Sequence, residues 1–200
     1  KGTAQVQLDS LAHGQATLTQ RKFYRVTGGS TQNKGVIPDI KLVDIYNDEF
    51  GERKAKNALK WDTIPTAPFK REGSVQPYTV KFTQLSQQRV ALDPQFKYLE
   101  ERKAISQKTA DQKKVVLDID QRRAELIDLE KQTLDAENQR RKATGQAPYA
   151  NWESYQASID ALVESRAKMK AHLRPSLPEE ETFITEAANV LLDYAKLQGR

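Results

Sequence analysis

Two residues near the start of the chain, Lys1 and Gln5, are of types that could carry out proton transfer together. Residues 3–8 alternate between apolar and polar types, which predicts a strand and puts positions four apart on the same face. A lysine acts as a general base only when it is neutral, so its pKa must be lowered from about 10.4 by burial or a cationic neighbour. An amide on the same face can accept a hydrogen bond from the amine and fix its direction. The spacing alone is a weak signal, and its weight comes from the surrounding sequence.

Two further segments support this interpretation of the pair. Residues 22–40 read Lys-Phe-Tyr-Arg-Val-Thr-Gly-Gly-Ser-Thr-Gln-Asn-Lys-Gly-Val-Ile-Pro-Asp-Ile, a predicted strand followed by a Gly-Gly turn. Residues 57–62 read Asn-Ala-Leu-Lys-Trp-Asp. Together with the opening Lys-Gly-Thr-Ala-Gln, they resemble the tail-specific proteases, or C-terminal processing peptidases, which are serine peptidases with a Ser/Lys dyad. Lys60 stands where that family usually has proline, and residues 186–197 resemble the family's last helix.

The resemblance is specific over residues 1–64 and looser beyond them. It implies that Lys1 is the catalytic general base, that Gln5 orients it, and that the nucleophilic serine lies upstream and is absent from this chain. In such a dyad the neutral amine takes the serine proton, and the oxygen then attacks a peptide carbonyl to form an acyl-enzyme. Because the chain opens without Met or a leader, we expect it to be the C-terminal portion of a larger protein that is inactive by itself.

The composition narrows the other classes of chemistry. The chain has no cysteine, which excludes disulfides, a thiol nucleophile and cysteine-bound zinc. Its two histidines, His13 and His172, are far apart, so we expect no metal and no other cofactor. The sequence contains no Gly-x-Ser-x-Gly elbow and no glycine-rich phosphate-binding loop. It also has no apolar run of about 18 residues, so we expect no membrane span in this chain.

The positive charge of the chain needs its own interpretation. The net charge is +5, which on its own would suit a nucleic-acid partner. Between Lys97 and Lys142, however, 12 basic residues are interleaved with 10 acidic ones, as on the solvated face of a helix. We therefore expect no nucleic-acid partner. The compact cluster of residues 140–142, Arg-Arg-Lys, is interpreted as complementing a helix C-terminus, with a phosphate or acidic-partner site as the alternative.

The patterns along the chain predict an α+β fold in three parts. Residues 1–45 would be the last few antiparallel strands of a protease core, with strands at 15–26 and at 40–43 in addition to the first one. Residues 46–77 would be a linker, in which the ring of Trp61 plugs an apolar pocket. Residues 78–200 would form a mainly α-helical C-terminal domain.

Several helix boundaries are marked in that last part. Asp93-Pro94 is a helix start, with Asp93 as N-cap, and Asp118 or Asp120 would cap the next helix, which Gly145 ends. A further helix would cover residues 152–173, with Ile159, Leu162 and Val163 facing inward. Residues 176–179, Ser-Leu-Pro-Glu, resemble a capping box for the last helix. That helix carries the best-defined apolar stripe of the chain: Ile184, Ala187, Ala188, Leu191 and Ala195.

The resemblance also implies location and partners. It indicates a bacterial cell-envelope enzyme in the periplasm, although the chain contains no visible signal sequence. Its substrates would be proteins with exposed C-terminal tails, gripped through a PDZ module that is absent here. The helical domain would gate the substrate chamber or dock an adaptor protein. The alternative is a non-enzymatic helical protein-binding module, in which Lys1 and Gln5 are irrelevant and a surface on residues 94–197 binds a partner.

Overall fold

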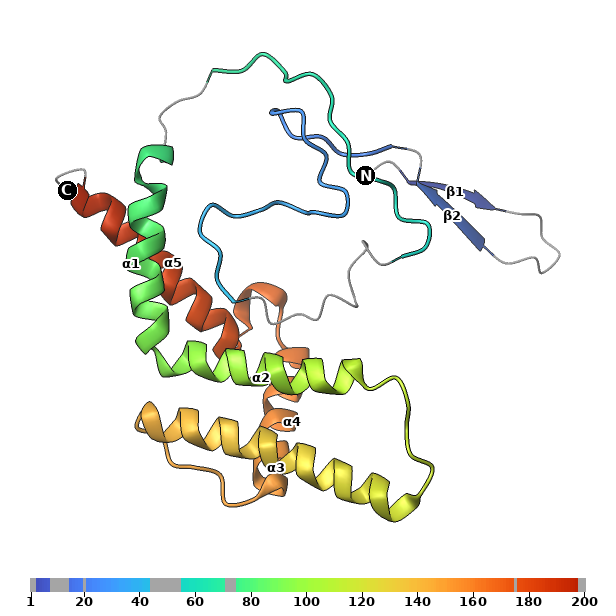
Figure 1. The fold of residues 1–200 in the computed structure, drawn as a ribbon, viewed down its shortest axis with the longest axis vertical. Coiled ribbons are helices and arrows are strands. Elements are labelled where there is room, and N and C mark those ends of the chain that lie inside the picture. The colour runs from blue at the N-terminus through green and yellow to red at the C-terminus, as the bar shows by residue number, and fades with distance from the viewer. Residues whose placement is uncertain are drawn as a thin grey trace. The chain divides into compact units, whose positions relative to one another are not determined.

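The computed structural model describes most of the chain and shows a predominantly helical protein (Figure 1). The described residues are 3–7, 15–19, 21–43, 55–70, 75–174 and 176–197, with the backbone alone described for the first two ranges. The chain divides into two units. The first comprises residues 1–39 and 48–75, and the second comprises residues 40–47 and 76–200.

The predicted α+β fold class is wrong, because the part of the chain that the structure describes is mainly α-helical. Strand structure there is limited to β1 (Thr3–Gln7) and β2 (Gln15–Thr19), which pair antiparallel. A lone hairpin of five-residue strands cannot form a β layer with a core of its own. The strand predicted at 15–26 stops at Thr19, and residues 40–43 form no strand.

The helical unit consists of two helix pairs and a crossing helix (Figure 1). Helices α2 and α3 form an antiparallel hairpin, α5 packs against α1, and α4 packs against α3. The bounds of the five helices are α1 (Thr79–Leu92), α2 (Pro94–Asp111), α3 (Ile119–Ala143), α4 (Trp152–Lys168) and α5 (Pro178–Leu197). Two single-turn 3-10 helices, Gln76–Tyr78 and Ala171–Leu173, precede α1 and α5.

Local capping interactions explain where these helices begin and end. The Asp93 carboxylate accepts a hydrogen bond from the Gln95 N–H at 2.8 Å, and Pro94 occupies the first helical position, as predicted. The Asp118 carboxylate caps α3 in the same way, accepting from the Gln121 N–H at 2.9 Å. Gly145 follows α3 with φ of +74°, a left-handed conformation that a side chain would oppose. These three boundaries are confirmed.

The core of the helical unit is small and largely aromatic. Its buried apolar side chains are Phe82, Phe96, Leu99, Ala136 and Tyr155. The Phe96 ring of α2 meets the Phe183 ring of α5 edge to face at 6.0 Å, and Phe82 of α1 meets Tyr194 of α5 at 6.1 Å. Aromatic contacts thus join α5 to both α1 and α2.

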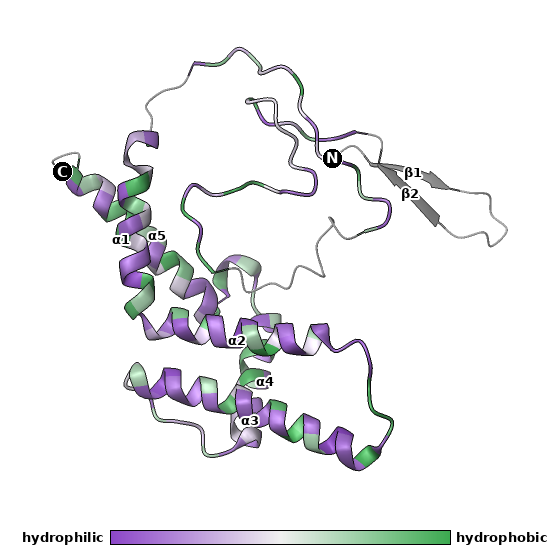
Figure 2. Ribbon diagram, in the orientation of Figure 1, coloured by the Kyte–Doolittle hydropathy of each residue, from purple (hydrophilic) through white to green (hydrophobic). Residues whose placement is uncertain are grey.

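The apolar stripe of α5 faces away from this core. Ile184 and Leu191 are 61% and 66% exposed, whereas the buried residues of the helix are Thr182 and Glu186. The hydropathy colouring of α5 in Figure 2 shows apolar and polar positions alternating along it. The pattern therefore located the helix but did not identify its packed face. In α4, Val163 is likewise exposed rather than inward.

The start of α5 also differs from its predicted capping box. Glu180, not Glu179, reaches back, and its Oε2 accepts the N–H of Leu177 at 2.7 Å. The contact is shifted by one residue because the helix begins at Pro178. Leu177, the residue before the helix, has no side-chain acceptor, so only the carboxylate half of a capping box is formed.

Candidate functional site

The predicted catalytic pair belongs to the hairpin of the first unit. Gln5 is in β1, where its backbone is paired with that of Thr17 in β2. Lys1 lies outside the described residues, and the Gln5 side chain is not described. The catalytic roles of Lys1 and Gln5 therefore stay predictions. The register ends with Thr3 opposite Thr19, the end of the hairpin from which the chain continues towards Lys22.

The first unit contains a cross-linked element that follows β2, which we call the clasp. It consists of residues 22–31 and 60–67. Within the first segment, the Thr31 N–H donates to the Phe23 carbonyl at 3.3 Å, which folds that segment back on itself. The two segments are joined by backbone hydrogen bonds: Ser30 N–H to Asp62 O (3.1 Å), Ile64 N–H to Gly28 O (2.9 Å) and Ala67 N–H to Val26 O (2.9 Å).

The turn of the clasp requires glycine at one position. Gly28 has φ of +85°, and a Cβ built there would lie 2.1 Å from the carbonyl oxygen of Ile64. Both the backbone conformation and the close approach of the second segment exclude a side chain. The predicted Gly-Gly turn is confirmed, and its physical reason is a neighbour 36 residues away in the sequence.

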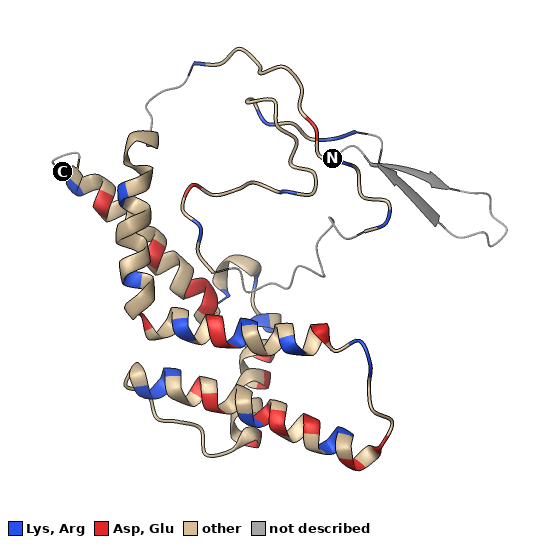
Figure 3. Cartoon of the chain, viewed as in Figure 1, with Lys and Arg blue, Asp and Glu red and all other residues tan. Residues whose placement is uncertain are grey.

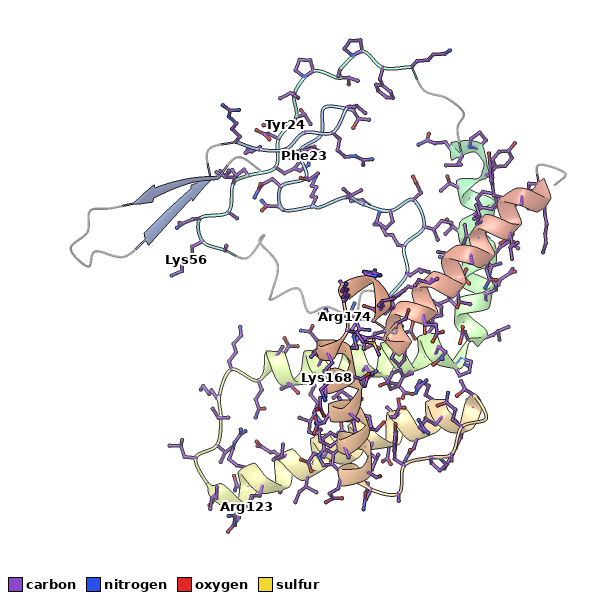
Figure 4. All side chains as sticks on the ribbon, turned by 180° about the vertical axis from the view of Figure 1, so that it is seen from behind. Phe23, Tyr24, Lys56, Arg123, Lys168 and Arg174 are labelled. Atoms are coloured by element: carbon purple, nitrogen blue, oxygen red, sulfur yellow. The ribbon has the colours of Figure 1, made fainter. Side chains whose placement is uncertain are left out.

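A carboxylate lies at the centre of the polar contacts of the clasp. Asp62 Oδ2 accepts a hydrogen bond from Lys22 Nζ at 3.0 Å, and the Tyr24 hydroxyl donates to Oδ1 at 3.1 Å. Lys22 Nζ also donates to the Lys60 carbonyl at 2.6 Å. Partial burial and the hydrogen bond to Asp62 raise the pKa of Tyr24, which is labelled in Figure 4. The Lys22 amine thus donates hydrogen bonds to a carboxylate and to a backbone carbonyl, both in the second segment of the clasp.

Trp61 fixes the other end of the clasp. Its Nε1–H donates to the Ser30 carbonyl at 2.9 Å, and Lys34 Nζ lies 3.6 Å from the centroid of its ring. Ser30 and Gln32 are both 5% exposed, whereas Trp61 is 40% exposed. The prediction that Trp61 plugs an apolar pocket is therefore wrong, since the indole is held by a carbonyl and a cation.

Both segments of the clasp stand out as motifs in the sequence, but the contact between them was not predicted. Lys22 and Tyr24 are two positions apart on an extended segment, so their side chains share one face. That spacing is the signal in the first segment. Nothing local indicates that the opposing group is Asp62, because it is 38 residues beyond Tyr24.

In the helical unit, the basic cluster at the end of α3 is occupied by contacts within the chain. Arg140 donates to both carboxylate oxygens of Glu137, at 2.5 and 2.9 Å, and to Gln95 Oε1 at 3.0 Å. Arg141 donates to the Ala147 carbonyl at 2.6 Å. These partners favour the structural interpretation over a phosphate site, because two of the three cations already have acceptors.

A groove with a volume of about 510 Å³ lies between the C-terminal half of α2 and the N-terminal half of α3. It is lined by charges of both signs: Lys108, Arg122, Glu125 and Asp128. Figure 3 shows the same mixture of red and blue along α2 and α3. The balance gives the groove no preference for an anion or a cation.

Two properties of the described ranges bear on the type of site. No group of three or more metal-ligating side chains gathers there. None of the helices in those ranges is both long and apolar enough to cross a bilayer.

Comparison with known proteins identifies the family of this chain. A family model described as the C-terminal domain of tail specific protease matches residues 45–196. The tail-specific protease of Haemophilus influenzae is 38% identical over 122 residues, which cover 59% of this chain and 18% of that protein. The chain thus spans less than a fifth of the relative's length. Because the family model covers most of its residues, the chain belongs to the family of C-terminal domains of tail-specific proteases.

Proposed function

We propose that this chain is the C-terminal part of a periplasmic serine endopeptidase that recognises its protein substrates by their C-terminal tails. Lys1 is the general base, Gln5 orients its amine, and the nucleophilic serine is supplied by a part of the protein outside this chain. The chain in isolation hydrolyses nothing, because it holds the base without the nucleophile.

The observation that carries this proposal is the strand that bears Gln5, within a chain that belongs to this family. β1 is extended and paired over Thr3–Gln7, so side chains on it alternate between two faces. We infer that Lys1 lies on the same face as Gln5, because the two positions are four apart in the sequence, so that the amide can orient the lysine amine. The named relative supports the reaction class, because it is a tail-specific protease.

In the proposed reaction, Lys1 transfers protons in successive steps. The neutral Lys1 amine removes the proton of the serine hydroxyl as its oxygen attacks the substrate carbonyl. The same ammonium then returns a proton to the leaving amine, and water hydrolyses the acyl-enzyme. Gln5 keeps the amine directed at the hydroxyl through both steps.

The test uses the full-length protein that contains this chain. Its substrate is a folded protein with an unstructured C-terminal tail, and cleavage is followed by gel electrophoresis and mass spectrometry. Lys1→Ala is expected to lower kcat by about 10³-fold or more, and Gln5→Ala by about 10- to 100-fold, in keeping with the loss of a general base or its orienting group. Lys41→Ala, which changes an exposed lysine of the other unit, is the control and should leave kcat unchanged.

Two results would contradict the proposal. One is a wild-type full-length protein that leaves the tailed substrate intact, and the other is a Lys1→Ala variant as active as the wild type. Either result would favour the non-enzymatic binding module. The isolated 200-residue chain, assayed in parallel, should show no cleavage.

A further inference from the structure

We propose that Asp62 is a positioning residue for this protease reaction: by holding Lys22 and Tyr24, it fixes the segment that leaves β2 and, through the hairpin, the strand that carries Gln5. The inference rests on the proposed function. Asp62 belongs to a segment that the catalytic assignment does not use, and its carboxylate is the shared acceptor of two side chains from the other segment.

The register of the hairpin connects the clasp to the proposed catalytic strand. Thr3 pairs with Thr19, so the start of β1 and the end of β2 lie at the same end of the hairpin. Lys1 precedes Thr3 by two positions, and Lys22 follows Thr19 by three. A constraint on Lys22 therefore acts at the end of the hairpin where Thr3 pairs with Thr19, which is the end closer in sequence to Lys1.

The contacts of Asp62 are suited to fixing a strand in direction as well as place. Lys22 Nζ lies 3.0 Å from Oδ2, and the Tyr24 hydroxyl lies 3.1 Å from Oδ1 and 3.2 Å from Oδ2. Two donors spaced two residues apart on one carboxylate define a line along the segment. The side chain of the intervening Phe23 is 56% exposed.

The second segment is anchored independently of the Asp62 side chain. The backbone carbonyl of Asp62 accepts the Ser30 N–H at 3.1 Å, and the neighbouring Trp61 donates to the Ser30 carbonyl at 2.9 Å. These bonds survive replacement of the carboxylate. Changing Asp62 to Asn therefore removes the charge that holds Lys22 and leaves the backbone pairing of the clasp in place.

The exposure of the pair separates positioning from global stability. The side chains of Lys22 and Asp62 are 19% and 48% exposed, and ion pairs of that kind contribute little to the stability of a fold. Catalysis is far more sensitive, because a shift of about 1 Å in a reacting group can lower the rate by about 100-fold. A positioning role thus predicts loss of kcat without loss of folding.

The experiment measures kcat, KM and thermal stability in the full-length protein with the tailed substrate. Asp62→Asn is expected to lower kcat by about tenfold or more while KM and Tm stay close to the wild-type values. Asp62→Glu restores the carboxylate and should recover most of the lost kcat. Tyr24→Phe removes one donor alone and should lower kcat in the same direction by a smaller factor. Asp39→Asn, another exposed aspartate of the same unit, is the matched control and should have no effect.

The outcomes distinguish this inference from the proposed function. If the wild type cleaves the substrate and Lys1→Ala abolishes cleavage, the function stands, and an Asp62→Asn variant with wild-type kcat overturns the positioning role. A variant whose Tm falls in parallel with kcat, or whose KM alone rises, also overturns it. If Asp62→Asn fails to fold, Tyr24→Phe decides by the same criteria. A wild type without activity overturns the proposed function instead.

Discussion

Arg89 of α1 and Glu186 of α5 form a two-contact ion pair that fixes one helix against the other. Arg89 Nη2 lies 2.8 Å from Glu186 Oε1, and Nε lies 3.1 Å from Oε2. The Arg89 Nη1 extends the contact to Asp193 Oδ2 at 2.7 Å, about two turns further along the same face of α5. Glu186 is only 3% exposed, so its charge depends on this arginine. The packed face of α5 is thus charged and aromatic.

Removing Arg89 should strongly destabilise the helical unit. Arg89→Met leaves Glu186 buried without its cation, a change that typically costs about 3 kcal/mol or more. Arg123→Met is the matched control, because Arg123 is paired with Asp120 at 3.5 Å on the surface, with both side chains mostly exposed (Figure 4). That variant should change the free energy of unfolding by less than about 0.5 kcal/mol. Urea unfolding of the isolated chain measures both, and equal effects would contradict the burial of the Glu186 charge.

The same pair predicts a dependence of stability on acid. Burial acts to raise the pKa of Glu186, but the hydrogen bonds from Arg89 and Ser86 outweigh it and lower the pKa below 4.5. A carboxyl whose pKa is lowered by folding stabilises the protein above its unfolded pKa, and this contribution is lost as pH falls through the folded pKa. We therefore expect the free energy of unfolding to decrease as pH drops below 4.5.

Glu186→Gln isolates this contribution. The variant should be less stable than the wild type at pH 7, and the difference should narrow as the pH falls towards the folded pKa of Glu186. Urea unfolding of the wild type and the variant, at pH 7 and at a pH below 4.5, gives the comparison. A difference that is constant with pH would show that the charge of Glu186 has no role.

The turn of the clasp gives a third prediction through two glycines. Gly28→Ala meets both a left-handed φ, which costs about 1–2 kcal/mol, and a carbonyl oxygen 2.1 Å from the new Cβ. Gly35→Ala meets a similar φ of +62° with no atom within 4 Å, so it carries the conformational cost alone. Amide hydrogen exchange at Ile64, which donates to the Gly28 carbonyl, should accelerate strongly in the Gly28 variant and much less in the Gly35 variant. Equal acceleration in the two variants would contradict the close approach.

The sequence predicted what local interactions decide. The N-caps at Asp93 and Asp118 and the end of α3 at Gly145 follow from side chains within a few residues of each boundary, so they could be read without a fold. The extent of the strands could not, because a β-rich composition describes suitability for a sheet and not the presence of partners. The described hairpin has one strand pair, and the α+β prediction failed on that point.

The clasp and the packing of α5 needed non-local information. Asp62 meets Tyr24 across 38 positions, and Arg89 meets Glu186 across 97. An apolar stripe is normally the packed face of a helix, yet α5 packs through its other side, where Glu186 contacts Arg89 and Tyr194 contacts Phe82. Periodicity alone does not reveal which face has a partner.

The last prediction follows from the orientation of α5. It compares two large apolar residues, one in α2 and one in α5. Phe96 is 1% exposed and contacts Phe183 at 6.0 Å, so Phe96→Ala should cost about 3–5 kcal/mol by creating a cavity. Leu191 belongs to the apolar stripe that the sequence predicts for α5, but it is 66% exposed. Leu191→Ala should therefore change the free energy of unfolding by less than about 0.5 kcal/mol. Both are measured by urea unfolding of the isolated chain. A large decrease in the free energy of unfolding for Leu191→Ala would mean that the apolar stripe is buried. The side of α5 that bears Glu186 could not then be its packed face. A small cost, with a large one for Phe96→Ala, would confirm that α5 packs through its charged and aromatic side and leaves its apolar side to solvent.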